Sequence, residues 1–209
     1  MKALRPFLPG LFGVLLLITG SCEKETFRGT VTDYDGNVYQ TIKIGDQWWM
    51  AENLMTTKFT NGELINSGVY IQNNNANNVG IYGRLYTWTV AVDNRKLCPT
   101  GWHLPSESEY NVLLSNVTSP ADLKEEGYSH WLPPNTLATN SVSFTALPGG
   151  YYTSTEFTGI NETGLFWLSD EVDAARAKGF RLYYDNSPTT GDLIHSQKNN
   201  AFSVRCIKD

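Results

Sequence analysis

Among the residues of this chain that can do chemistry, Cys22 has the most informative surroundings. Lys2 and Arg5 come first, an apolar stretch covers residues 11–18, and Thr-Gly-Ser fills residues 19–21. A charged start, an apolar middle and a small-residue end are typical of a cleaved export signal. The apolar stretch is too short for a membrane-spanning helix, which needs about 20 apolar residues.

The segment "LITGSC" that ends at Cys22 resembles a bacterial lipobox, although Thr19 stands where leucine is commonest. In such a segment the signal is removed and the cysteine is acylated. The resemblance predicts a signal peptide over residues 1–21, lipidation of Cys22 and a short acylated linker over residues 22–27. An ordinary secretory signal with a chance cysteine is the alternative. Acyl chains would form a stable anchor, since each buried CH₂ contributes about 0.8 kcal/mol.

Cys98 and Cys206 are the other two cysteines. In an exported chain, an even pair of cysteines usually forms a disulfide. This bond would close a long loop, and the chain-entropy model assigns it about 4–5 kcal/mol. Two free thiols are the alternative.

The histidines are His103, His130 and His195, and none has the H-x₃-H spacing of a helical metal pair. His103 stands beside apolar neighbours in "GWHLP", so we expect a buried, hydrogen-bonded side chain rather than a catalytic one. The segment "DYDGN" is acidic enough to suggest a calcium loop. An EF-hand needs glycine and glutamate at its sixth and twelfth positions, and counting from Asp33 these hold Val38 and Ile44. The segment is therefore interpreted as a turn, and the sequence predicts no metal site and no cofactor.

The charge balance limits the classes of partner. The chain has 16 basic and 21 acidic residues, a net charge of −5, and loss of the basic signal segment would make it more acidic. An acidic surface argues against nucleic acid and against electrostatic docking to anionic lipids. Charged residues are only 18% of the chain while aromatic residues are 12%, which suits a compact extracellular domain rich in loops.

The helices predicted to position these residues lie in the middle of the chain. Ser106 and Glu109 match a capping box, and apolar residues follow at helical spacing, so we expect a helix over residues 107–116. A second short helix is expected at Ser119-Pro120. A third is expected on a face made by Leu85, Trp88 and Val92.

Strand-forming residues occupy both ends of the domain. Residues 28–54 resemble strands separated by turns. Later candidates are "SVSFTALP", "GLFWLS", "GFRLYY" and "AFSVRCI", which are separated by glycine-rich loops. Strands and helices in this order predict a single α+β domain over residues 28–209.

Several phrases resemble the Fibrobacter succinogenes major paralogous domain family over residues 27–209. They are "GTVTDYDGNVYQTIKIGDQWWMAENL", "YGRLYTW", "LCPTGWHLPSESEY", "FTALPGGYY", "FWLS" and "SVRCIKD". Members occur in exported lipoproteins and surface proteins of Bacteroidetes-type bacteria, and the family has no established biochemical activity. The resemblance implies a lipid-anchored protein of the outer membrane, exposed at the cell surface.

"GWHLPSESEY" and "FSVRC" are more distantly similar to phrases of formylglycine-generating enzymes. This similarity implies a C-type-lectin-like fold, with two main helices flanking a small, mostly antiparallel sheet and a long loop region. Its binding surface would be built from loops between residues 140 and 197. The closely spaced reactive cysteines of those enzymes are absent here, and so are the "EPN", "QPD" and "WND" strings of calcium-dependent lectins.

Five residues of the late region are the candidates for ligand binding. Tyr151, Tyr152 and Trp167 could stack on a ligand, with core packing as the alternative, most strongly for Trp167. Asp170 and Glu171 could supply carboxylates, with ordinary solvated acids as the alternative. We therefore expect a non-enzymatic binding module for a glycan or a surface protein. A structural subunit of a surface assembly, or an enzyme with an unrecognised site, are the alternatives.

Overall fold

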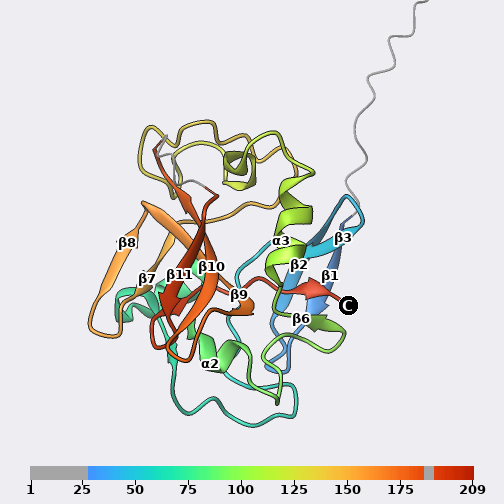
Figure 1. The fold of residues 1–209 in the computed structure, drawn as a ribbon, viewed down its shortest axis with the longest axis vertical. Coiled ribbons are helices and arrows are strands. Elements are labelled where there is room, and N and C mark those ends of the chain that lie inside the picture. Colours follow the sequence, from blue (N-terminus) through green and yellow to red (C-terminus); the bar gives the residue numbers. More distant parts are fainter. Residues whose placement is uncertain (1–27, 186–190) are drawn as a thin grey trace, which may run out of the picture.

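The computed structural model describes residues 28–185 and 191–209. Two β-sheets are joined by short helices and long loops (Figure 1). The predicted signal peptide and acylated linker lie outside the described residues. Within the described ranges, no helix is both long and apolar enough to cross a bilayer.

The first sheet has five strands in the order β1-β2-β3-β13-β6, and all its neighbours pair antiparallel. Gly36, with a φ of 86°, lies in the turn between its first two strands, which confirms the interpretation of "DYDGN" as a turn. The strands are β1 (Arg28–Thr32), β2 (Val38–Ile44), β3 (Gln47–Met50), β6 (Trp102–His103) and β13 (Ile207–Lys208).

The second sheet has eight strands in the order β11-β10-β9-β7-β12-β5-β4, with β8 paired to β7. It is mixed, because β7 and β9 pair parallel while their other neighbours pair antiparallel. The strands are β4 (Val69–Tyr70), β5 (Leu85–Thr87), β7 (Gly149–Tyr152), β8 (Phe157–Ile160), β9 (Thr163–Glu171), β10 (Arg176–Tyr183), β11 (Leu193–Gln197) and β12 (Ala201–Phe202).

The helices are short. The predicted central helix is present as α3, and its capping box is formed by Ser106 and Glu109. The predicted helix at Ser119-Pro120 is a 3₁₀ turn, while Leu85 belongs to a strand and only the residues after it are helical. The helices are η1 (Gln72–Asn74), η2 (Ala76–Asn78), α1 (Val79–Tyr82), α2 (Trp88–Ala91), α3 (Glu107–Leu114) and η3 (Pro120–Leu123).

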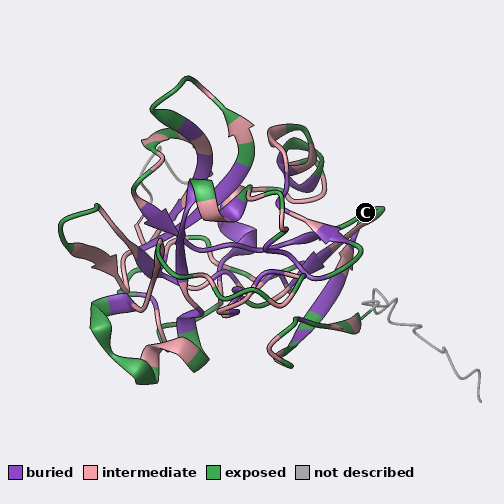
Figure 2. Cartoon of the chain, turned by 90° about the horizontal axis from the view of Figure 1, so that it is seen from below, coloured by how far each residue is buried: buried purple, intermediate pink, exposed green. Residues whose placement is uncertain are grey.

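Strand β9 lies between two apolar clusters. Its first six residues are all buried, which a strand covered on both faces requires. Leu165 and Trp167 face one cluster, while Phe166 and Leu168 face the other, as the alternation of a strand dictates. Figure 2 shows the buried residues along the central strands and the exposed residues along the outer loops.

The predicted disulfide is confirmed. Cys98 and Cys206 are bonded, with their Cα atoms 5.9 Å apart and a separation of 108 positions in sequence. Both cysteines are buried in the first of the two apolar clusters. Neither is therefore available as a free thiol.

The prediction of an α+β, C-type-lectin-like fold with two main helices flanking a small sheet is wrong. The structure is mostly β, and its sheets have five and eight strands. Helix α3 has eight residues, while α1 and α2 have four each. Of the late strand candidates, "GLFWLS" lies in β9 and "GFRLYY" lies mostly in β10, whereas "SVSFTALP" forms turns and loops instead of a strand. The assembly of the strands into one wide sheet depends on pairing between residues far apart in sequence.

Candidate functional site

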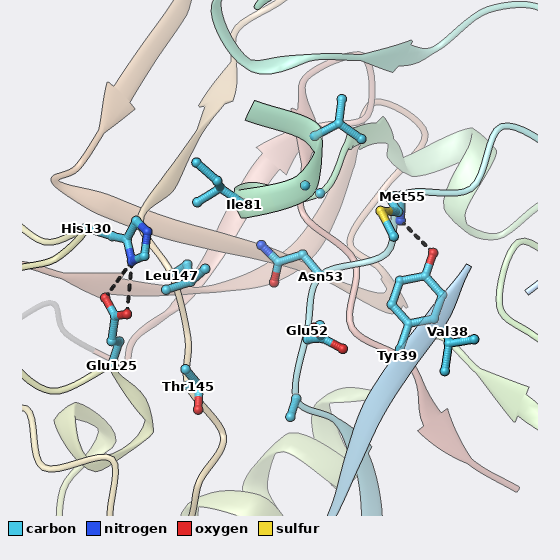
Figure 3. A pocket seen from close by; sticks show the side chains of 14 residues that line it. Val38, Tyr39, Glu52, Asn53, Met55, Ile81, Glu125, His130, Thr145 and Leu147 are labelled. Atoms are coloured by element: carbon cyan, nitrogen blue, oxygen red, sulfur yellow. Dashed lines mark hydrogen bonds and ion pairs between the residues drawn. The ribbon is translucent and has the colours of Figure 1, made fainter. Parts of the chain in front are cut away.

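A cleft of about 330 Å³ opens between α1, the segment 38–55 and the loop 125–147. We call it the histidine cleft. Figure 3 shows His130 and Glu125 at one end, Tyr39 and Val38 at the other, and Asn53 between them. Its lining combines apolar side chains with two carboxylates and one imidazole.

Polar groups of the histidine cleft are already bonded within the protein. His130 Nδ1 lies 2.9 Å from both carboxylate oxygens of Glu125. Asn53 Nδ2 donates to the carbonyl of Tyr82 at 2.8 Å, and Asn53 Oδ1 accepts from Arg205 Nε at 2.8 Å. These bonds hold the wall in place and leave few of its groups for a ligand.

A larger cleft of about 590 Å³ lies on one face of the eight-stranded sheet, and we call it the sheet cleft. Strands β7 to β12 build it, and Figure 1 shows β7, β8, β10 and β11 together on the side of the molecule away from the C terminus. Leu165 and Phe202 supply apolar surface. The polar and aromatic lining consists of Tyr151, Thr153, Thr158, Glu162, Thr163, Arg181, Tyr183, His195, Ser196 and Asn200.

Alternation along β10 places two of these residues in the cleft. Phe180 and Leu182 are buried in the core, with at most 1% of their surface exposed. Arg181 and Tyr183 therefore point to the opposite face of the strand, where both line the cleft. Burial raises the pKa of Tyr183, and the neighbouring Glu162 raises it further.

A glycine positions the aromatic residue on β7. Gly150 has a φ of 62°, and a Cβ atom there would lie only 2.3 Å from the carbonyl oxygen of Thr158 on β8. A residue with a side chain would not fit this close approach. The next residue, Tyr151, lines the sheet cleft and packs on the Phe202 ring in a T-shaped arrangement, with centroids 5.9 Å apart.

Most polar side chains of the sheet cleft are free to bind. Within residues 28–185 and 191–209, seven of them make no hydrogen bond or ion pair through their side chains. An array of unpaired donors and acceptors beside aromatic rings can bind a polar ligand that also has an apolar face. The seven are Tyr151, Thr158, Glu162, Thr163, Arg181, Tyr183 and His195.

A model of the Fibrobacter succinogenes major domain matches residues 42–208, which include every strand of the eight-stranded sheet, strands β3, β6 and β13 of the five-stranded sheet, and all the described residues that line the sheet cleft. The chain belongs to this family. No curated protein and no solved structure shows a significant match to the chain.

The two adjacent tyrosines predicted to bind a ligand lie on opposite faces of β7. Tyr151 lines the sheet cleft. Tyr152 does not, because it points to the other face of β7 and packs on Tyr70 and Phe157, with centroids 4.3 and 4.9 Å away.

The other three predicted ligand residues also lie outside the sheet cleft. Trp167 is fully buried, and its Nε1 donates to the carbonyl of Tyr86 at 2.7 Å, so it is a core residue in this domain. Asp170 accepts a hydrogen bond from the backbone N–H of Glu107 at 2.6 Å, at the start of α3. Glu171 forms an ion pair with Lys198.

The three histidines of the family domain occupy different environments. His130 lines the histidine cleft, and His195 is exposed at the sheet cleft. His103 is hydrogen-bonded as predicted, but the prediction that it is buried is wrong, because 41% of its side chain is exposed. No group of three or more His, Cys, Asp or Glu side chains in the described ranges is arranged to hold a metal ion.

Sequence reasoning missed Arg181, Glu162 and the threonines of the sheet cleft. A usable signal was present in "GFRLYY", where Phe180 and Leu182 alternate with Arg181 and Tyr183. That period of two indicates a strand with one apolar and one polar face. The contribution of β8 to the cleft has no comparable signal, because "FTGI" does not alternate.

Proposed function

We propose that this chain is a lipoprotein of the outer cell surface whose domain binds a glycan in the sheet cleft without changing it chemically. The observation that supports this most is the set of seven unpaired polar side chains, which includes the aromatic residues Tyr151 and Tyr183. Sugars offer many hydroxyl groups for hydrogen bonds and apolar ring faces for contact with aromatic rings. The lining of the sheet cleft matches both properties.

The size of the cleft favours a glycan over a surface protein. Clefts of about 300–1,000 Å³ are typical for small ligands, and the sheet cleft falls in this range at about 590 Å³. A stable protein partner would need roughly 800 Å² of surface on each side. A short stretch of polysaccharide fits the available space better.

The number of carboxylates in the sheet cleft favours glycan binding over glycan hydrolysis. Most glycoside hydrolases use two carboxylic acids that flank the bond to be cleaved. Among the described residues that line the sheet cleft, Glu162 is the one that supplies a carboxylate. This supports a binding module rather than a glycosidase.

The lipid anchor is supported by the sequence alone. Cys22 ends a segment with the order of a lipoprotein signal, and only a few residues separate it from Arg28, where β1 begins. An extended linker of this length would hold the domain within roughly 20 Å of the membrane. Replacing Cys22 by alanine should move the protein to the soluble fraction or leave it unprocessed, as fractionation of cells will show. Full retention of the variant in the detergent phase would contradict the anchor.

The adjacent tyrosines of β7 provide a matched test of glycan binding. The probes are a panel of plant and bacterial polysaccharides, each added in turn to a native gel. Migration of the purified full chain should be retarded in a gel that contains a polysaccharide to which it binds. We expect Tyr151→Ala to weaken binding about tenfold, through the loss of aromatic contact area. Tyr152→Ala removes the same ring from the other face and should leave binding unchanged.

Equal losses of affinity in the two variants would contradict the location of the binding site in the sheet cleft. Failure of the folded wild-type chain to bind any member of the panel would contradict glycan binding itself. Circular dichroism of both variants establishes that each is folded.

A further inference from the structure

Among the described arginines, Arg181 differs from the others because its side chain makes no hydrogen bond and no ion pair with the described residues. Its Nε is buried and makes no hydrogen bond among the described residues. No described carboxylate lies within ion-pair distance of its guanidinium group. Each of the other arginines in these ranges donates to a side chain or a carbonyl: Arg28, Arg84, Arg95, Arg176 and Arg205.

The guanidinium group also faces the space where a ligand would lie. Arg181 lines the sheet cleft together with Glu162 and Tyr183. Burial raises the pKa of the Tyr183 hydroxyl, Glu162 adds to this rise and Arg181 opposes it, so both charges act at that hydroxyl. The two charged groups nevertheless form no ion pair. The cleft therefore offers a positive group and a negative group that remain separately available.

We propose that Arg181 binds the carboxylate of an acidic sugar, so that the glycan of the sheet cleft contains uronic acid or another carboxylate-bearing residue. This inference rests on the proposed function. A planar guanidinium matches a carboxylate through two parallel hydrogen bonds, which gives both strength and direction. Thr158, Thr163 and Glu162 then form hydrogen bonds with the hydroxyl groups of the ligand.

Overall charge argues that the recognition is local. The chain has a net charge of −5, so it does not attract polyanions by its general field. Selectivity for an acidic glycan must come from contact between Arg181 and the carboxylate.

The experiment compares polysaccharides that differ only in their carboxylates. Polygalacturonate and alginate are titrated into the purified full chain by calorimetry, each beside its carboxyl-reduced, neutral form. We expect the acidic form to bind about 10- to 100-fold more tightly, the range of a charge-assisted bidentate contact. This comparison uses the wild-type protein and does not depend on how any variant folds.

Two arginines of the same strand supply the matched variants. Arg181→Gln should lower affinity for the acidic form to that of the neutral form, and Arg181→Lys should restore it only in part. Arg176→Gln is the control, since Arg176 is exposed, is paired with Asp173 and lies outside the cleft. It should leave both affinities unchanged.

The outcomes separate this inference from the proposed function. Equal binding of acidic and neutral forms, with no effect of Arg181→Gln, would overturn the inference and leave glycan binding intact. Equal binding of sulfated dextran would indicate a general anion site and would also overturn it. Absence of binding to every polysaccharide would overturn both proposals together.

Discussion

His103 connects the cap of α3 to the C-terminal residue of the chain. Its Nδ1 lies 2.6 Å from Asp209 Oδ1 and its Nε2 lies 2.8 Å from Glu109 Oε1. Burial opposes the charged imidazolium, but the bonds to Asp209 and Glu109 outweigh it and raise the pKa of His103. Protonated His103 therefore stabilises the folded state.

The raised pKa predicts how stability depends on pH. The contribution is fully present below about pH 6.5, the pKa of an unfolded histidine, and is lost as the pH rises through the higher folded value. His103→Gln should remove this fall from the stability–pH profile measured by urea unfolding between pH 5 and 8. Because 41% of the side chain is exposed, solvent screening limits the effect to roughly 0.5–1 kcal/mol. A variant profile parallel to that of the wild type would contradict this role.

The roles of some individual residues could be predicted from the sequence, and the roles of others could not. The pairing of Cys98 with Cys206 could be predicted because a chain that carries a predicted export signal leaves few alternatives for two cysteines. Core packing was a stronger alternative for Trp167 than for Tyr151, but Tyr151 and Tyr152 could not be ranked, since they are adjacent aromatic residues in one strand-like segment. Which of them faces a cleft depends on the neighbouring strands, which local sequence does not specify.

Elements whose determinants are local were the easiest to predict. Helix α3 follows from a capping box and an apolar spacing that lie within a dozen residues. Strand β9 has the opposite character, because it pairs antiparallel with β10 and parallel with β7. A parallel partner needs a crossover between the two strands, so no single stretch of sequence contains the information for it.

The disulfide joins two elements that are far apart in the chain. Cys98 precedes β6, Cys206 precedes β13, and these two strands pair with each other in the five-stranded sheet. Replacing both cysteines by serine should lower the free energy of unfolding by about 2–5 kcal/mol, because the unfolded chain regains the freedom of a long loop. Denaturant unfolding of the variant and of the wild type with and without reductant measures this.

The reduced wild type is the control for the cysteine substitutions. It should lose about as much stability as the double variant, since both lack the same covalent link. Unchanged stability in both samples would contradict a structural role for the bond. Two alkylatable thiols in the non-reduced wild type would contradict the bond itself.

At the scale of the whole molecule, the two sheets place the proposed anchor and the proposed binding site apart. Strand β1, which follows the predicted linker, is the edge of the five-stranded sheet, while the sheet cleft belongs to the eight-stranded sheet. Figure 1 shows β1 and the strands β7, β8, β10 and β11 on different sides of the molecule. A domain tethered through β1 would therefore keep its cleft accessible to a polysaccharide outside the cell.

The fold class could not be predicted from the chain because it depends on how many strands share a sheet. Short phrases such as "GWHLPSESEY" suggested a lectin-like arrangement, but they determine only the α3 region. The eight-stranded sheet depends on contacts such as Ala201 with Thr87 and with Tyr152. These contacts join segments separated by many tens of residues, and local propensity does not contain them.

Hydrogen–deuterium exchange of the full chain locates a bound glycan, because a bound polysaccharide slows exchange in the segments that it covers. The exchange is compared with and without the polysaccharide of the panel that binds most tightly. We predict slower exchange at residues 151–165, 181–183 and 194–202, which build the sheet cleft. We predict no change at residues 38–55 and 125–147, which build the histidine cleft. Slower exchange at the histidine cleft, with the sheet cleft unaffected, would contradict glycan binding in the sheet cleft.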